Sequence, residues 1–338
     1  MLSYPDPTIS VVMSVYNAEQ TLADSINSII NQTYQNFEFI IIDDGSTDTS
    51  LEIITSFSMK DDRIHLIINE RNLGVAASLN KGIKVARGKF IARMDADDIS
   101  LPKRFESQIS FLENHTEVGV LGTAINEKLL SHRGESRVRS FEQNNDQIQW
   151  RLLFRCALFH PTVMARRHLF NENLYNPDYL VAQDYDLWTR LAPITEFANL
   201  PTPLLDLHIH QTSSSIIHKS LQKSNSTKIQ EGYMATYLGE DYFNKKGLET
   251  IRKEPSNVAG LVLNLYHSFI EYHKPIDQDK KYIRSDAALL IFNNARNGKN
   301  PFCWILILKA LTMEPKLIMR GVRASKKWLG AHKKAFKS

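Results

Sequence analysis

The chain has 338 residues, 43% of them hydrophobic and 23% charged, with a formal net charge of +4. This length suffices for one large α/β domain with an additional region, and the composition is that of an ordinary globular protein, excluding no globular class. Eight Lys and Arg residues and no acid lie within 316–338. Subtracting these eight positive charges from the net charge of +4 leaves −4 for residues 1–315. The positive charge is therefore local, which excludes a generally polyanion-binding protein.

The start of the chain and its cysteines predict the compartment. Residues 1–7 contain neither the basic segment nor the apolar segment of a secretory signal, so we expect no such signal there. Cys156 and Cys303 are far apart and flanked by apolar residues, so both are expected to be buried free thiols in a reducing compartment. The apolar run 302–308 is much shorter than the roughly 20 residues of a membrane span. We therefore expect a cytosolic protein.

The first 121 residues alternate between strand-like and helix-like segments. Residues 9–15 form a β-branched run typical of a strand buried on both faces. Such alternation implies right-handed crossovers and a parallel sheet, the core of a nucleotide-binding type of fold. Strands are predicted over 9–15, 37–42, 64–68, 90–94 and 118–121, with intervening helices from 19 to 30, after 48 and over 74–85.

Three carboxylates, Asp95, Asp97 and Asp98, follow the predicted strand 90–94. They fall at the carboxyl end of a strand, where open α/β sheets bind ligands. Like charges so close repel one another unless a cation such as Mg²⁺ or Mn²⁺ neutralises them. The alternative is that Asp97 or Asp98 caps a helix with Pro102 in its first turn. The cluster favours a metal site, with Asp98 a candidate cap.

Two further acids, Asp43 and Asp44, end the predicted strand 37–42. In a parallel sheet they share an edge with the first cluster. A carboxylate at this position can accept the imide N–H of a uracil, and Tyr16, after the first strand, can stack on the base. The alternative is an Asp-Gly-Ser turn in which Ser46 or Asp48 caps the next helix. Two acidic strand ends on one edge favour the binding role.

With these residues in place, the chain resembles glycosyltransferase family 2, which has the GT-A fold. The resemblance implies inverting transfer from a nucleotide-activated sugar, usually a uridine one, with Mn²⁺ or Mg²⁺ on the diphosphate. By position, Tyr16 and Asp44 resemble the base-binding pair, Asp95 the ribose or metal contact, and Asp97 a metal ligand. The matching segments are 14–17, 32–33, 43–48, 72–74 with 80–82, and 94–98.

The second half carries further parts of this resemblance. Residues 159–164 resemble the acceptor-side strand, and 182–188 the segment of the catalytic base. The family usually has Glu-Asp there, whereas this chain has Gln183-Asp184, so Asp184 matches the base. A general base of this kind deprotonates the acceptor hydroxyl during in-line attack. The alternative is that Asp184 only caps a helix over 185–191.

The segment 204–210 resembles the one that commonly carries Tyr-Arg-x-His. His210 matches the histidine that contacts phosphate or metal, and His208 stands in place of the arginine. The alternative for His210 is an ordinary hydrogen-bonded histidine, which is the commoner role of a lone histidine.

The expected organisation is a GT-A domain over 1–215, Rossmann-like with a mostly parallel sheet and flanking helices, and a helical region over 216–338. Within the domain, 1–115 form the nucleotide-sugar half and 116–215 the acceptor half. The helical region is expected to bury apolar sets at 261, 265 and 269, at 289, 290 and 292, and at 305, 307 and 311.

The resemblance is strongest to bacterial transferases that extend lipooligosaccharide or O-antigen chains, which implies a glycan or lipid-linked acceptor. The basic, apolar tail predicts an amphipathic helix on an anionic membrane at the cytoplasmic face. The alternatives for the tail are a solvated helix that caps the domain and a nucleic-acid-binding patch, although we expect no nucleic-acid partner. Two alternatives are a nucleotidyltransferase and a non-catalytic nucleotide-sugar-binding module. Residues 14–19 lack the glycine-rich, cationic phosphate loop that the former usually has.

Overall fold

The computed structural model describes residues 6–129, 136–209, 217–244, 247–295, 302–315 and 317. The chain divides into two compact units, Met1–Ile229 and Gln230–Ser338. The strands are β1 (Ile9–Val15), β2 (Phe37–Asp43), β3 (Ile64–Ile68), β4 (Phe90–Met94), β5 (Ile99–Ser100), β6 (Val118–Leu129), β7 (Ser136–Arg139), β8 (Met164–Arg166) and β9 (Glu196–Ile209).

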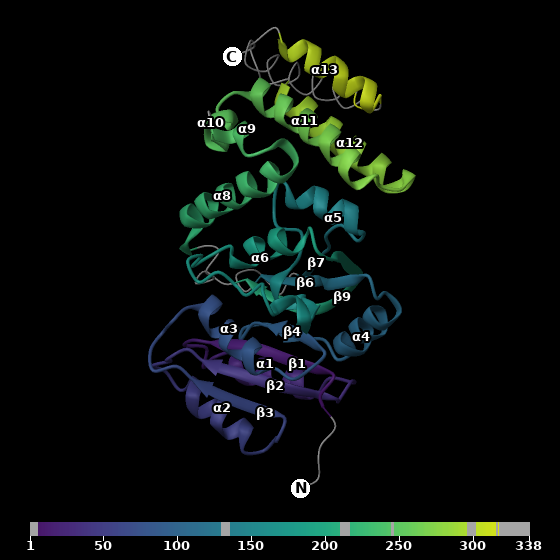
Figure 1. Ribbon diagram of the computed structural model, residues 1–338. Coiled ribbons are helices and arrows are strands. Elements are labelled where there is room, and N and C mark those ends of the chain that lie inside the picture. The colour runs from purple at the N-terminus through teal and green to yellow at the C-terminus, as the bar shows by residue number, and fades with distance from the viewer. Residues whose placement is uncertain are drawn as a thin grey trace, which may run out of the picture. The chain divides into compact units, whose positions relative to one another are not determined.

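The helices alternate with the strands in the first unit and follow one another in the second (Figure 1). In the first unit they are α1 (Leu22–Ile30), α2 (Ser50–Ser58), α3 (Val75–Val85), α4 (Arg104–Asn114), α5 (Asn145–Leu152) and α6 (Gln183–Leu191), with short 3₁₀ helices at His160–Thr162 and Arg167–Phe170. The later helices are α8 (Lys219–Leu238), α9 (Asp241–Asn244), α10 (Leu248–Arg252), α11 (Pro255–His273), α12 (Asp277–Ala295) and α13 (Phe302–Met313).

Within the described residues, the strands form one sheet in the order β3-β2-β1-β4-β8-β6-β9-β5, with β7 paired to β6. The strands β3, β2, β1 and β4 are parallel, as their helical connections require. The short strand β8 then pairs antiparallel with both β4 and β6, so the second half of the sheet is mixed. These features confirm the expected α/β fold with flanking helices and a helical C-terminal region.

The pairing register sets the position of the loops that follow β1, β2 and β4. Val15 lies opposite Asp43, and Met13 lies opposite Met94. The carboxyl ends of these three strands therefore meet at one edge of the sheet. β1 and β2 are buried along almost their whole length, as their continuous apolar sequences predict.

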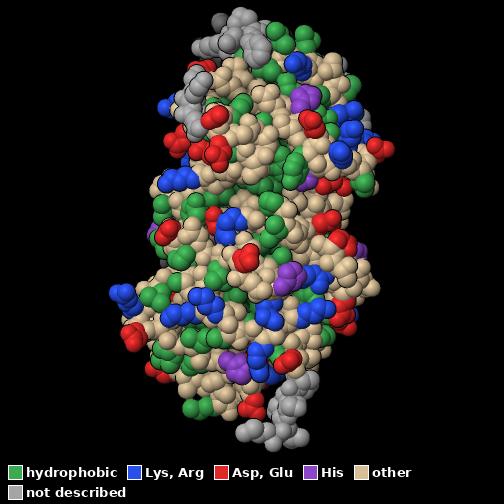
Figure 2. Space-filling view, in the orientation of Figure 1, with side chains coloured by type: hydrophobic (Ala, Val, Ile, Leu, Met, Phe, Trp, Pro, Cys, Tyr) green, Lys and Arg blue, Asp and Glu red, His purple; other side chains and the backbone are tan. Residues whose placement is uncertain are grey.

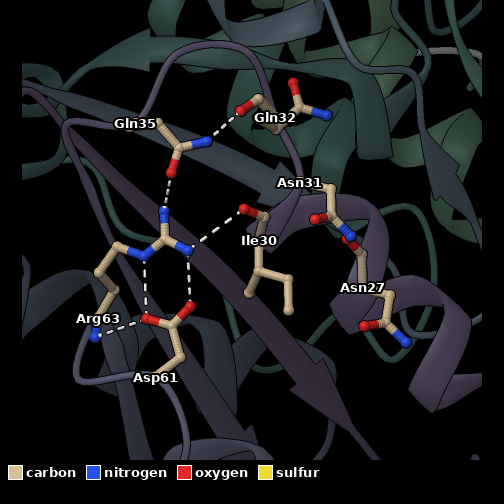
Figure 3. A network of polar contacts seen from close by, with 7 residues as sticks. All are labelled: Asn27, Ile30, Asn31, Gln32, Gln35, Asp61 and Arg63. Atoms are coloured by element: carbon tan, nitrogen blue, oxygen red, sulfur yellow. Dashed lines mark hydrogen bonds and ion pairs between the residues drawn. The ribbon is translucent and has the colours of Figure 1, made fainter.

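The opposite edge, at the amino ends of the strands, is held by a polar network around Arg63 (Figure 3). The Arg63 guanidinium forms two bonds with Asp61, at 2.9 and 2.6 Å, and donates to the Ile30 carbonyl at 3.2 Å. It also lies 4.4 Å from the ring centre of Phe37, at the start of β2. The network ties the end of α1 to the turn before β3, so it supports the scaffold at the edge away from the acidic loops.

In the second unit, α11, α12 and α13 pack against one another. The expected core residues Leu261, Leu265 and Phe269 of α11 are buried. On α12, Phe292 is buried, whereas Leu289 and Leu290 are only partly so. No helix within the described residues is long and apolar enough to cross a membrane.

The apolar set named for α13 is only partly buried, because Ile307 and Leu311 are half-buried and Ile305 is exposed. Cys303, Leu306 and Ala310 are buried, while Ile305 is 50% exposed and Leu308 is 62% exposed. The helix is apolar all round, so periodicity gives no basis for choosing its buried face.

Candidate functional site

The loops after β1 and β2 are joined by hydrogen bonds at the carboxyl edge of the sheet. Asn17, which adopts a positive φ of 50°, donates its main-chain N–H to Ser46 Oγ at 3.1 Å. Its side-chain Oδ1 accepts the Thr47 main-chain N–H at 2.8 Å. The neighbouring Tyr16 ring is 48% exposed. The ring is thus placed at this edge with an open face that can stack on a planar ligand.

Asp44 is buried, and its carboxylate already accepts three hydrogen bonds from the chain. The donors are Asn69 Nδ2 at 2.7 Å and the main-chain N–H groups of Leu73 and Gly74, each at 2.9 Å. A carboxylate has about four acceptor positions, so one remains for a ligand. Asp44 therefore positions the 72–74 loop, in addition to any contact with a base.

The adjacent Asp43 is also buried, and its Oδ1 has no hydrogen-bond partner among the described residues. Its Oδ2 accepts the Ser46 main-chain N–H at 3.2 Å. A buried carboxylate oxygen without a donor is costly, which is expected where a ligand supplies the missing N–H or O–H. The resemblance assigned the base contact to Asp44, whereas the residues themselves did not distinguish the two adjacent acids.

Gly45 allows the loop after β2 to lie directly against the segment before α3. It has a φ of +72°, and a Cβ here would lie 2.7 Å from the carbonyl carbon of Arg71. Any other residue at this position would have to adopt the unfavourable left-handed conformation, and its Cβ would also clash with the neighbouring backbone. The Asp-Gly-Ser turn is therefore required for the close approach that brings Leu73 and Gly74 to Asp44.

The three acids after β4 converge as the sequence predicts. One carboxylate oxygen from each of Asp95, Asp97 and Asp98 lies within 4.8 Å of the others. Asp98 does not cap a helix: α4 begins at Arg104, and Asp98 precedes the short strand β5. Its Oδ1 accepts the His208 main-chain N–H of β9 at 3.0 Å. The capping alternative is wrong because the chain makes one more strand pairing before the helix begins.

The electrostatics of this cluster suit a divalent cation. Burial raises the pKa of Asp98 well above its usual range, and the charges of Asp95 and Asp97 raise it further. Burial also raises the pKa of Asp95, although its ion pair with Arg93 lowers it. Clustered carboxylate oxygens are the ligands that Mg²⁺ and Mn²⁺ prefer. The donor set therefore fits such an ion, and Arg93 supplies part of the compensating charge.

Of the two candidate histidines, the structure places one. His208 Nδ1 lies 2.8 Å from the Asp97 carbonyl oxygen, so this nitrogen carries the proton and donates. With its main-chain bond to Asp98, His208 links β9 to the acidic loop, a role that the sequence did not predict. His210 lies outside the described residues, so its assignment stays a prediction.

Asp184 lies in the first turn of α6, which follows Ala182 in a left-handed conformation with φ of 67°. The side chain is half-buried, and its Oδ2 lies 3.6 Å from the sulfur of Cys156. Burial raises the pKa of Asp184, opposed by hydrogen bonds from the Tyr185 main chain and the Cys156 thiol and by the charge of Arg93. A carboxylate with a raised pKa is better suited to accept a proton near neutral pH.

A histidine and a tyrosine, His160 and Tyr175, form a pair whose protonation is affected by the charges of this region. His160 Nε2 lies 2.8 Å from the Tyr175 hydroxyl, and burial with the nearby Arg93 charge holds the pKa of His160 well below its usual range. Burial raises the pKa of Tyr175, and the charges of both Asp184 and Asp95 contribute. The charges of Asp184 and Asp95 thus act on the same tyrosine hydroxyl.

Comparison with known proteins identifies the family of this chain. Residues 10–172 match the model of glycosyl transferase family 2. The chain is 33% identical over 290 residues to an uncharacterized glycosyltransferase of Haemophilus influenzae, covering 82% of this chain and 84% of the relative. It is 38% identical over 189 residues to an uncharacterized glycosyltransferase of Methanocaldococcus jannaschii, covering 54% of this chain and 64% of the relative.

Two solved structures share the fold at low sequence identity. One is TarS 1–349 of S. aureus in complex with UDP-GlcNAc, with a TM-score of 0.52 at 17% identity, covering 92% of each chain. The other is a mannosyltransferase of Pyrobaculum calidifontis in complex with GDP-Man and Mn²⁺, with a TM-score of 0.51 at 14% identity, covering 95% of this chain and 85% of that one. With the similarity to the Haemophilus relative over most of both chains, we conclude that this chain belongs to glycosyltransferase family 2.

Proposed function

We propose that the protein is an inverting, metal-dependent glycosyltransferase that moves a sugar from a UDP-linked donor to a glycan or lipid-linked acceptor. The observation that carries this proposal is the convergence of the three carboxylates Asp95, Asp97 and Asp98 after β4, on the sheet edge that also carries the loops of Tyr16 and Asp44. The charges of Asp184 and Asp95 both act on Tyr175, which supports a place for Asp184 near this edge. The GDP-Man and UDP-GlcNAc complexes of its structural neighbours support a nucleotide-sugar donor. The sugar itself is a hexose or an N-acetylhexosamine.

In this proposal the residues divide the work between donor and acceptor. Tyr16 stacks on the base, and the free acceptor positions of Asp44 and Asp43 receive its imide N–H. Asp97, together with Asp95, would hold Mn²⁺ or Mg²⁺. Bound there, the ion supplies Lewis-acid stabilisation of the departing diphosphate. Asp184 removes the proton of the acceptor hydroxyl, so that attack from the opposite face inverts the anomeric carbon without a covalent intermediate.

Thermal unfolding tests the donor class directly. We expect a UDP-sugar with Mn²⁺ to raise the Tm by several degrees, because a ligand at about a hundred times its Kd stabilises the folded state by about 2.7 kcal/mol. The same UDP-sugar with EDTA should give a much smaller shift. A panel of UDP-, GDP- and CMP-sugars identifies the base. If the Tm rises with nucleoside triphosphates but with none of the nucleotide sugars, the result would contradict the proposal and favour a nucleotidyltransferase.

We further propose peripheral attachment to the cytoplasmic face of the inner membrane, in the synthesis of cell-surface polysaccharide or lipooligosaccharide. On the face shown in Figure 2, basic side chains are interspersed with acidic ones, and no single sign dominates. The concentrated positive charge is in the sequence of 316–338, which lies outside the described residues except for Leu317. It directly follows α13, whose exposed Ile305 and Leu308 add apolar surface. Basic and apolar residues together suit an anionic lipid surface.

A truncation tests this attachment. A chain that ends at Glu314 lacks all eight terminal cations. We expect it to lose at least tenfold in affinity for vesicles of phosphatidylglycerol and phosphatidylcholine, since each basic residue near the surface contributes about 1 kcal/mol. Co-sedimentation measures the affinity, with pure phosphatidylcholine vesicles as the control. If both chains bind the anionic vesicles equally, the tail is not the membrane anchor.

A further inference from the structure

A thiol lies against the carboxylate that we propose as the base. Cys156, in the loop after α5, was expected to be a buried thiol, but it is only half-buried. Its sulfur lies 3.6 Å from Asp184 Oδ2 and 3.4 Å from the Leu158 carbonyl oxygen. A thiol has one proton to donate, and a carboxylate is a stronger acceptor than a main-chain carbonyl. The expectation of full burial was wrong, because periodicity does not predict which loop packs beside the start of α6.

The two groups influence each other's protonation, as direct contact requires. Burial raises the pKa of the Cys156 thiol well above its usual range, and the charge and hydrogen bond of Asp184 raise it further. In return, the thiol hydrogen bond opposes the effect of burial on Asp184. The other groups that act on this carboxylate are the main-chain N–H groups of Tyr185 and of Asp184 itself and the Arg93 guanidinium. Cys156 is therefore the only cysteine and the only side-chain hydrogen-bond donor among these contacts.

We propose that Cys156 is a positioning residue for the reaction: its thiol donates to Asp184 Oδ2, holds the carboxylate in its orientation beside the donor site, and keeps it ready to accept the proton of the acceptor. This proposal rests on the proposed function of Asp184. A carboxylate has about four acceptor positions, so the thiol and the main-chain N–H groups of Asp184 and Tyr185 leave about one for the incoming hydroxyl. Cys156 does not touch the reacting atoms.

The contact can be tested without any sugar donor. The chain has two cysteines, so Cys303→Ser leaves Cys156 as its sole thiol. Iodoacetamide alkylates the thiolate, forming a sulfur–carbon bond and releasing iodide. The alkylation rate rises with pH: the midpoint of this rise is the pKa of the thiol, and the plateau is the rate at which the fully ionised thiol reacts. Adding Asp184→Asn should lower the midpoint by about one unit, which raises the rate below the midpoint about tenfold. The plateau should not change, since it reports access to the thiol.

Asp186→Asn is the matched control, because Asp186 is in the same helical turn but pairs with Arg190. It should leave the midpoint unchanged. A rise of the plateau without a shift of the midpoint in Asp184→Asn would mean that the variant only exposes the thiol, and this result would overturn the proposal. An equal shift of the midpoint in both variants would overturn it too, since the effect would then not be specific to Asp184.

Turnover tests the consequence for the reaction. With UDP-GlcNAc, or the donor that stabilises the protein most, Cys156→Ala should move the acid limb of the kcat profile to higher pH and lower kcat several-fold. Cys156→Ser, which retains a donor, should recover most of the parent profile. If Asp184→Asn is inactive but Cys156→Ala has the parent profile, the positioning role is wrong and the base assignment stands. If Asp184→Asn keeps full activity, the proposed base itself is wrong.

Discussion

Replacing Asp184 with asparagine should reduce kcat about a thousandfold, because a positioned general base typically contributes between about a hundredfold and ten-thousandfold. The amide has nearly the same shape but cannot accept the proton of the attacking hydroxyl. Binding of the donor should be unchanged, since Asp184 lies in α6 and not in the loops that carry Tyr16 and Asp44. Release of UDP from the donor measures kcat, and thermal shift measures binding.

The pH dependence gives a second test of the same residue. Burial raises the pKa of Asp184, and a base must be unprotonated to act. Turnover should therefore fall as the pH decreases through a midpoint above the ordinary value for aspartate, and this limb should be absent from the residual activity of Asp184→Asn. Asp186→Asn, in which the replaced carboxylate normally pairs with Arg190, should retain the limb. A parent profile that stays flat down to the ordinary range of aspartate would contradict the assignment.

Replacing Asp97 with alanine should lower turnover on the order of a thousandfold, because loss of the ion would cost the several kcal/mol of charge stabilisation that a Lewis acid contributes. Binding of Mn²⁺, measured by titration calorimetry in the presence of UDP, should weaken at least tenfold. Asp24→Ala, which removes an exposed acid from the first turn of α1, is the control and should leave both values unchanged.

The same variant should not lose stability when metal is absent. The charge of Asp97 raises the pKa of both Asp95 and Asp98, so its removal relieves repulsion within a buried cluster. We expect the Tm in EDTA to stay the same or to rise, as is common when a residue serves function at the expense of stability. A fall of the Tm in EDTA together with unchanged Mn²⁺ binding would assign Asp97 to the fold and not to the metal.

Much of the first half of the fold was predictable because its signals are local. Strands β1, β2 and β4 are buried apolar runs, β3 is a short run rich in isoleucine, and the helices between them have apolar residues at helical spacing. Parallel pairing then follows from the length of the connections, and with it the shared edge of Asp43 and Asp95. The second half was less predictable, because β8 has three residues and gives no periodic signal.

The sequence by itself therefore determined the α/β class, the alternation of the first strands and helices with parallel pairing, and the clustering of three acids after β4. These depend on which residues are neighbours along the chain and on the periods of strand and helix. Tertiary structure alone decided that Asp98 accepts a bond from His208, that Asp43 keeps an unpartnered oxygen, and that Cys156 contacts Asp184. These contacts join residues up to 110 positions apart, and they depend on how strands and loops pack in three dimensions.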